Sequence, residues 1–262
     1  MILLIKSGNT MINFAVAKDG KIICTFACHN NPFWTSDEYY SWLAPLLAAR
    51  GIPFTSLTYC VIASVVPETF YNLSQFAVAN FPDCFTTLSA LHPKLGLSVL
   101  LENPAGVGSD LLANAIGAYE HYGRKPSVII DCGTATTSTL VDQDGNFVGA
   151  LIAPGFKTSL LALCQNGAQL PVMFFKKPVV VIGKNTFDAI NAGMYFGHSG
   201  MVSNLAKVSR HYLHKTLHVP LTDIQVIGTG GYITNIESEE ISIIDEELLF
   251  KGLWVFYNRV CS

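Results

Sequence analysis

The chain has 262 residues, which fits one large domain or two small ones. Hydrophobic residues make up 50% of the sequence and charged residues 13%, which supplies a sizeable core and argues against a disordered chain. The net charge of −3 and the lack of a Lys/Arg run argue against a nucleic-acid partner or an anionic membrane surface, and no apolar run is long enough to span a bilayer.

The N-terminal residues and the cysteines indicate a cytoplasmic protein. The apolar run at 1–6 is too short for a signal peptide, and the seven cysteines lack Cys-x-x-Cys spacing. Without a secretory signal, we expect these thiols to be reduced.

The first part of the chain predicts a strand meander followed by a helix. Apolar runs predict strands at 2–5, 11–17 and 21–27, with Asp19-Gly20 as a hairpin turn. A helix is then expected to begin at Thr35 or Ser36, either of which can cap it, and to run to Arg50, before the stop signal Gly51-Ile52-Pro53.

The next part predicts a second strand–helix segment and a loop that opens a helix. The strand is expected at 59–66 and the helix at 68–80, and weak alternation at 84–101 predicts short strands and loops. The loop 103–110 precedes a helix at 111–122 that is rich in Ala and Leu.

Asp110 lies at the start of that helix, where the helix dipole favours a carboxylate. On this pattern alone, an N-cap role is the expected one, and a chemical role remains the alternative.

The central stretch 128–137, Val-Ile-Ile-Asp-Cys-Gly-Thr-Ala-Thr-Thr, predicts a buried strand, a tight turn and a polar second strand. Asp131 closes the first strand, and Gly133 lets the backbone turn without a Cβ clash. A carboxylate beside exposed backbone N–H groups suits a phosphate and its cation, although an ordinary hairpin explains the spacing equally well. Cys132 has no base beside it, so a structural thiol is expected rather than a nucleophile.

A second copy of this pattern favours the phosphate interpretation. Residues 3–10, Leu-Leu-Ile-Lys-Ser-Gly-Asn-Thr, repeat the order of apolar strand, polar residue, glycine and hydroxyl or amide residue. Such self-similarity indicates a duplicated unit. Two strand–turn–strand units around a nucleotide's phosphates resemble the device of actin-like kinases, and a third glycine turn at 227–231 lies where such proteins hold the nucleoside.

The rest of the chain predicts alternating strands and helices. Strands are expected at 147–152 and 179–182, and helices at 156–166, from 186 to beyond 206, and at 246–259. Glycines in the long helix, at 193, 197 and 200, indicate close helix packing, with packing between subunits as one alternative.

In their order and spacing, these motifs resemble those of the type III pantothenate kinases over essentially the whole chain. The matching segments lie at 7–10, 63–67, 103–104, 107–110, 131–137, 152–155, 168–171, 182–186, 229–231, 252–253 and 258. The resemblance implies an α/β fold of two actin-like, ribonuclease-H-like lobes with a nucleotide cleft between them, which we expect at 1–115 and 116–262. The second lobe would supply most of the dimer contact.

The resemblance also implies an activity and its cofactors. Such enzymes are cytosolic homodimers that transfer the γ-phosphoryl group of ATP to the primary hydroxyl of pantothenate, the first step of coenzyme A biosynthesis. They use Mg²⁺ and a monovalent cation, K⁺ or NH₄⁺.

Matched position by position, the resemblance implies roles for three groups of residues. Asp110 would be the general base, and Asp131 would bind the monovalent cation. The residues implied to meet ATP are Lys6, Ser7, Gly8, Asn9, Thr10, Met11, Ile12, Asn13, Thr134, Gly230 and Gly231. The residues implied to line the substrate are Leu101, Gly108, Ser109, Asp110, Leu111 and Gly167.

Several of these positions depart from the family's pattern. The departures are Lys6 for Asp, Leu101 for Tyr, Leu111 for Arg, Gly167 for Thr, and Ser138-Thr139 for Phe-Asp. Because Leu101 and Leu111 offer no side-chain donor to a carboxylate, we expect weak or absent phosphorylation of pantothenate. Two alternatives stay open: an inactive paralogue that keeps the fold and dimer as a nucleotide-binding or protein-interaction module, and a kinase for a less polar alcohol.

Three interactions are open to the Lys6 side chain in this site. Its ammonium can repel Mg²⁺, contact a phosphate directly, or pair with Asp131 or Asp110. Two unit charges about 4 Å apart interact by about 4 kcal/mol at an effective dielectric of 20. Pairing is the outcome that we expect, because a buried ammonium without a partner is costly.

Overall fold

The computed structural model describes residues 1–165 and 176–262. The chain divides into two compact units, Met1–His121 with Glu247–Ser262, and Tyr122–Glu246. Each unit contains one five-stranded sheet, so the predicted α/β class is confirmed. The division differs from the predicted one in two ways: the change of unit falls after residue 121, and the C-terminal segment belongs to the first unit.

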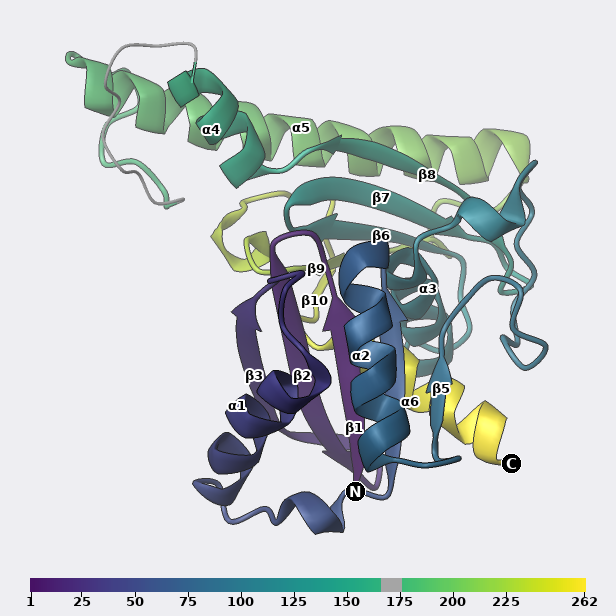
Figure 1. Cartoon of the computed structure of the whole chain (residues 1–262). Coiled ribbons are helices and arrows are strands. Elements are labelled where there is room, and N and C mark those ends of the chain that lie inside the picture. Colours follow the sequence, from purple (N-terminus) through teal and green to yellow (C-terminus); the bar gives the residue numbers. More distant parts are fainter. Residues whose placement is uncertain (166–175) are drawn as a thin grey trace. The chain divides into compact units, whose positions relative to one another are not determined.

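The sheet of the first unit has the order β3-β2-β1-β4-β5 (Figure 1). Its strands are β1 (Ile2–Ser7), β2 (Met11–Lys18), β3 (Lys21–His29), β4 (Tyr59–Ser64) and β5 (Phe85–Thr87). Strands β1 to β3 form the predicted antiparallel meander, while β4 lies parallel to β1 and β5 parallel to β4. The carboxyl ends of β1 and β4 therefore meet at one edge of the sheet.

Four helices belong to this unit: α1 (Ser36–Ala48), α2 (Pro67–Asn80), α3 (Ser109–His121) and α6 (Leu248–Cys261). Helix α1 begins as predicted, because Thr35 accepts the Glu38 N–H and the Glu38 carboxylate accepts the Thr35 N–H. Helices α3 and α6 pack against each other, and both contact β4.

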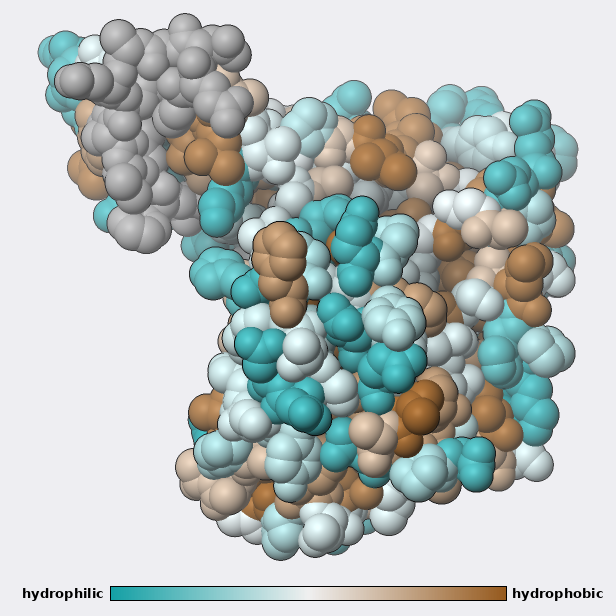
Figure 2. All heavy atoms as spheres, in the orientation of Figure 1, coloured by the Kyte–Doolittle hydropathy of each residue, from teal (hydrophilic) through white to brown (hydrophobic). Residues whose placement is uncertain are grey.

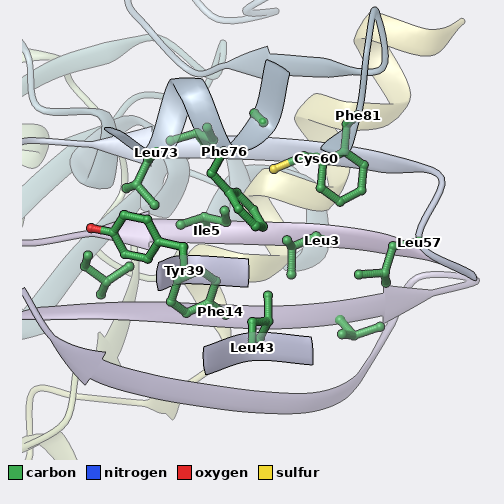
Figure 3. Close-up of a cluster of buried hydrophobic side chains, with 14 of the residues drawn as sticks. Leu3, Ile5, Phe14, Tyr39, Leu43, Leu57, Cys60, Leu73, Phe76 and Phe81 are labelled. Carbon is green, nitrogen blue, oxygen red and sulfur yellow. The ribbon is translucent and has the colours of Figure 1, made fainter. Parts of the chain in front are cut away.

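A core of alternating strand residues and helical aromatics fills one side of this sheet (Figure 3). Leu3 and Ile5 of β1 are fully buried, as is Phe14 of β2. They pack in one cluster with Tyr39 of α1 and Phe76 of α2, whose ring centroids lie 6.3 Å apart. Because strand side chains alternate between faces, β1 presents its other buried residues to the opposite side, where it contacts α6.

The second unit repeats this topology with the order β10-β9-β6-β7-β8. Its strands are β6 (Ser127–Cys132), β7 (Ala135–Val141), β8 (Phe147–Pro154), β9 (Gln225–Thr229) and β10 (Ile243–Ile244). Strands β6 to β8 form an antiparallel meander, β9 lies parallel to β6, and β10 lies parallel to β9. The duplication predicted from the two turns is confirmed by this shared strand order.

Two helices complete the second unit: α4 (Phe156–Gln165) and the long α5 (Thr186–Thr216). Val128 and Ile130 of β6 pack in one cluster with Tyr195 and Val202 of α5. In the described part of the chain, every helix falls short of the length or hydropathy needed to cross a membrane.

The strand predicted at 179–182 is wrong. This segment has no strand structure, and Val179 and Ile182 are 100% and 79% exposed. An apolar run becomes a strand only beside a partner strand, and both edges of the second sheet are formed by β8 and β10. The predicted Gly167 site and the motif at 168–171 lie outside the described residues.

Candidate functional site

The turn between β1 and β2 is fixed by hydrogen bonds from inside and outside the hairpin. The Gly8 N–H donates to the Met11 carbonyl over 3.0 Å. The Asn30 side-chain amide donates to the Gly8 carbonyl over 2.7 Å, and the Asn30 N–H donates to the Thr10 carbonyl over 2.9 Å. The backbone that the sequence assigns to ATP is thereby held in one conformation.

The same turn is also tied to the neighbouring strand and helix. The buried Ser7 hydroxyl lies 3.0 Å from the Thr69 hydroxyl of α2, and the Ser7 carbonyl accepts the Val65 N–H over 3.0 Å. The sequence analysis missed Asn30 and Thr69, because hydrogen bonds between residues far apart in the chain leave no repeated motif in the sequence.

Lys6 is half-buried and lies in β1 opposite Asn13 of β2. Its Cε lies 3.8 Å from the position that a Cβ on Gly8 would take, so the side chain follows the turn. The pairing of Lys6 with Asp131, Asp110 or both stays a prediction from the sequence.

The start of α3 lies beside this turn, joined to it through the end of β4. The Ser109 hydroxyl donates to the Ser64 carbonyl over 3.0 Å, and Val65, the next residue, donates its N–H to Ser7. The implied phosphate turn and the implied catalytic helix therefore meet across Ser64 and Val65, at the carboxyl ends of parallel strands. Ligands bind at such edges in open α/β sheets.

Asp110 is half-buried in the first turn of α3, which begins at Ser109. Its Oδ1 accepts the Leu111 N–H over 2.9 Å, so the carboxylate satisfies one of the free amides of the helix N-terminus. It does not occupy the N-cap position expected from the sequence, since it already lies inside the helix.

Gly108 is the position where the backbone passes closest to this carboxylate. A Cβ on Gly108 would lie 2.6 Å from Asp110 Oδ1 and 3.3 Å from Val65 Cγ1. The absence of a side chain at Gly108 therefore leaves room for the orientation of Asp110.

In the second unit, the turn after β6 is packed against the start of α4. The Thr134 carbonyl accepts the Gly155 N–H over 3.1 Å and the Thr158 hydroxyl over 2.7 Å. Thr134 itself is exposed, whereas Asp131 at the end of β6 is only 8% exposed. The turn thus presents a hydroxyl to solvent and keeps a carboxylate beneath it.

The glycine turn after β9 closes over this carboxylate. Gly230 has φ +91°, and a Cβ there would collide with Asp131 Oδ1 and lie 2.7 Å from the Cys132 nitrogen. Glycine is needed for both reasons. The Tyr232 N–H donates to the Cys132 carbonyl over 3.1 Å, which fixes the turn beside β6. Asp131 and Gly230, two of the residues singled out in the sequence, therefore lie side by side, and Gly231 next to them is exposed.

Cys132 is buried, and burial raises the pKa of its thiol to about 12. A thiol in this state stays protonated and unreactive at neutral pH. This agrees with the structural role expected for it.

Comparison with known proteins identifies the family. A family model described as type III pantothenate kinase matches residues 2–208. A type III pantothenate kinase of Rhodospirillum rubrum is 37% identical over 99% of this chain and 98% of its own length, and one of Halalkalibacterium halodurans is 33% identical over 99% of both chains. The chain belongs to the type III pantothenate kinase family.

Solved structures that resemble this family member share its fold at low identity. A Baf family transcriptional activator from Campylobacter jejuni has a TM-score of 0.58 and 16% identity, covering 99% of both chains. The activator of 2-hydroxyisocaproyl-CoA dehydratase from Clostridium difficile has a TM-score of 0.52 and 12% identity, covering 99% of this chain and 95% of its own. At these identities the likeness shows the fold, and it supports the actin-like class predicted from the sequence.

Proposed function

We propose that this protein is an ATP-dependent pantothenate kinase that makes 4'-phosphopantothenate, the first step of coenzyme A biosynthesis. In this reaction, the primary hydroxyl oxygen of pantothenate bonds to the γ-phosphorus of ATP, and the bond from that phosphorus to the bridging oxygen of ADP breaks. One proton leaves the hydroxyl. The observation that carries the proposal is that the turn at Ser7-Gly8 and the start of α3 meet across Ser64 and Val65.

Asp110 is our candidate for the base that accepts this proton. It is a half-buried carboxylate at the carboxyl edge of the first sheet, and its Oδ1 is oriented by the Leu111 N–H. A positioned base contributes a factor of about 10²–10⁴ to a rate.

Two sets of residues are candidates for binding ATP. In the first unit these are residues 6–13, whose turn is held by Asn30 and Thr69. In the second unit they are Thr134, Gly230 and Gly231. Phosphoryl transfer depends mainly on positioning and charge neutralisation, which rigid backbone turns can supply.

The cation sites differ in how well the residues present fit them. The Asp131 carboxylate, buried against Gly230, fits a monovalent cation, K⁺ or NH₄⁺, which would offset charge beside the phosphates. Lys6 does not fit a protein-held Mg²⁺ site at the β1 turn, because its ammonium would repel the ion. Its charge fits direct contact with a phosphate instead.

The substrate residues proposed from the family pattern lie close to Asp110 in the chain. Gly108, Ser109 and Leu111 surround it at the start of α3, and Leu101 is half-buried in the preceding segment. Gly167 is kept as a proposal from the sequence alone.

We also propose that the protein works as a cytoplasmic homodimer, with the contact on the second unit. Figure 2 shows apolar patches, in brown, over α4 and α5. Exposed apolar side chains on β8, α4 and α5 include Leu151, Ile152, Leu161, Leu163, Phe187 and Phe196. The glycines of α5 at 193, 197 and 200 have open space where a Cβ would point, which leaves a smooth helix face for close packing.

The test is ADP release by the purified protein with ATP, pantothenate, Mg²⁺ and K⁺. We expect turnover that depends on pantothenate, weaker than the 1–10³ s⁻¹ usual for metabolic enzymes. Asp110→Asn keeps the shape of the side chain and should lower kcat by about 10²–10⁴. If no phosphorylated product forms at any substrate concentration, the proposal fails, and the non-catalytic paralogue becomes the better account.

A further inference from the structure

Two exposed cysteines belong to the first unit and take no part in the site described above. Cys84 directly precedes β5, and Cys261 is the last residue of α6. Both thiols are exposed, whereas Cys28, Cys60 and Cys132 are buried. Because a thiol must be accessible to react with an oxidant, Cys84 and Cys261 are the more reactive pair.

The register of the sheet turns the side chain of Cys84 toward α6. The Cys60 N–H donates to the Cys84 carbonyl over 3.0 Å, and Cys60 pairs with Phe85 of β5. Cys60 and Phe85 both pack in the core cluster on the side of the sheet that α1 and α2 cover. Because side chains alternate along a strand, Cys84 and Tyr59 point to the opposite side, where α6 contacts β4.

The last turn of α6 brings Cys261 to the same place. The ring centroids of Tyr59 and Tyr257 lie 5.1 Å apart, and Tyr257 precedes Cys261 by one turn of α6. The phenols of both tyrosines are hydrogen-bonded to the Cys261 thiol, and Cys84 interacts electrostatically with the same two phenols. The two thiols therefore lie around one pair of tyrosine rings.

Two further contacts hold the end of α6 against the chain that follows β5. Lys94 Nζ donates to the Val260 carbonyl over 3.1 Å. The Arg259 guanidinium donates to the Leu95 carbonyl over 2.5 Å. In Figure 1, the yellow end of α6 lies at the same end of the first sheet as the start of β5. The last turn of α6 is thus held near β5 while both cysteines are reduced.

The two tyrosines also favour reaction at Cys261. Burial and, after it, the neighbouring Cys261 raise the pKa of the Tyr59 phenol to about 12, and both causes raise the pKa of Tyr257 as well. Both phenols therefore stay protonated at neutral pH and can donate hydrogen bonds to a thiolate at Cys261. The thiolate is the form that attacks an oxidant.

From this arrangement we propose that Cys84 and Cys261 form a reversible disulfide when the protein meets hydrogen peroxide. The Cys261 sulfur attacks one peroxide oxygen, the O–O bond breaks, and the other oxygen leaves with the thiol proton as water. The Cys84 thiol then attacks the sulfur of the resulting sulfenic acid, the S–S bond forms, and the hydroxyl leaves as a second water. A thiol reductant restores both cysteines by exchange.

This bond would join two segments that are far apart in the sequence. The whole second unit, Tyr122–Glu246, lies between the two cysteines and would be enclosed in the loop. A cross-link restricts the unfolded chain, and it does so more for a longer loop. The proposed base Asp110 lies at the carboxyl end of β4, whereas Tyr59 begins that strand. We therefore expect a gain in stability with turnover unchanged.

The test exposes the reduced, purified protein to a small excess of hydrogen peroxide and maps its unreduced peptides by mass spectrometry. We expect a peptide pair joined through Cys84 and Cys261, about 2 Da lighter than the two separate peptides, which dithiothreitol splits again. A bond between two chains, a pair through any other cysteine, or separate oxidation of Cys84 and Cys261 to acids overturns the inference.

Variants connect the bond with its effect. Cys84→Ser and Cys261→Ser each remove one thiol at nearly the same size, so each should abolish the peptide pair and leave turnover of the reduced protein unchanged. Peroxide should raise the urea midpoint of the parent by about 1 M and leave that of both variants unmoved. Cys24→Ser, which removes a half-buried thiol of β3, is the matched control and should behave as the parent. An equal response of the parent and Cys84→Ser contradicts the inference.

Discussion

Lys6 is the residue whose charge most changes what the proposed phosphate turn between β1 and β2 can bind. It is the last residue but one of β1, and its side chain lies beside the Gly8 turn. An ammonium here attracts phosphate and repels Mg²⁺ by similar electrostatics. ATP should therefore bind this turn without help from a divalent ion.

We predict that Lys6→Asp makes ATP binding depend on Mg²⁺. The substitution replaces a positive charge with a negative one, so the variant should bind ATP alone more weakly than the parent does. In the variant, Mg·ATP should bind about tenfold or more tightly than ATP alone. Calorimetric titration of both forms with and without Mg²⁺ measures this. Lys6→Gln, which only removes the charge, is the control. If the parent already binds Mg·ATP more tightly than ATP, Lys6 does not govern the site.

We predict that Gly108→Ala lowers kcat by about tenfold to a hundredfold, the range expected when a reacting group moves by about 1 Å. The new Cβ would lie 2.6 Å from Asp110 Oδ1, so the carboxylate must move. ADP release measures the loss, and circular dichroism checks the fold. Gly149→Ala, where a Cβ meets nothing within 4 Å, is the matched control. Equal activity in both variants would show that the position of Asp110 does not matter.

The sequence predicted the two strand turns where a motif repeats, and it missed the residues that hold the first turn through individual contacts. Gly8 and Gly133 were found because each follows an apolar strand and precedes a polar one. Asn30 and Thr69 hold the first turn through isolated hydrogen bonds between residues far apart in the chain. Such contacts have no local pattern to detect.

Among the elements, α5 and β7 meet through buried polar side chains. Thr136 of β7 lies 3.2 Å from His198 Nε2 of α5, and Ser138 lies 2.7 Å from Ser209. His198 is 5% exposed, and burial lowers the pKa of its imidazole. The folded protein therefore favours neutral His198, whereas the unfolded chain accepts a proton near pH 6.5.

We predict that this contact makes folding stability fall as the pH drops below about 6.5. The unfolded state binds the extra proton first, so the free energy of unfolding decreases, by at most about 1.4 kcal/mol per pH unit, until the folded state is protonated as well. Urea unfolding at pH 7.5, 6.5 and 5.5 measures it. His198→Gln should flatten the profile in this window. A His198→Gln profile parallel to the parent's would assign the pH dependence to other groups.

Element prediction failed where an element's identity depends on a distant partner. The run at 179–182 is as apolar as a strand but has no strand beside it, while β10 has only two residues and is a strand because β9 pairs with it. The C-terminal helix was predicted as a helix, but it was expected in the second lobe, whereas it belongs to the first unit. Its buried Leu253 and Phe256 belong to the unit of α3, although the whole of the second unit lies between these two helices in the sequence.

At the scale of the whole molecule, two units with one strand order indicate a duplicated ancestor that has since diverged. Both sheets place a meander beside two parallel strands, yet only the second unit carries a helix as long as α5. The exposed apolar residues of β8, α4 and α5 lie in that unit. Large exposed apolar surfaces are typical of protein interaction sites.

We predict that the protein is a homodimer held by this surface, and that Ile152→Glu and Phe196→Glu each shift it toward monomer. Ile152 and Phe196 are 71% and 43% exposed in the single chain, so a charge there should cost little in folding but much in an apolar interface. Light scattering across a hundredfold range of concentration measures the dissociation, and we expect the Kd to rise by at least about a hundredfold. Phe33→Glu is the matched control, because Phe33 is 86% exposed on the first unit. A monomeric parent, or equal dissociation of all three variants, would place the dimer contact elsewhere or remove it.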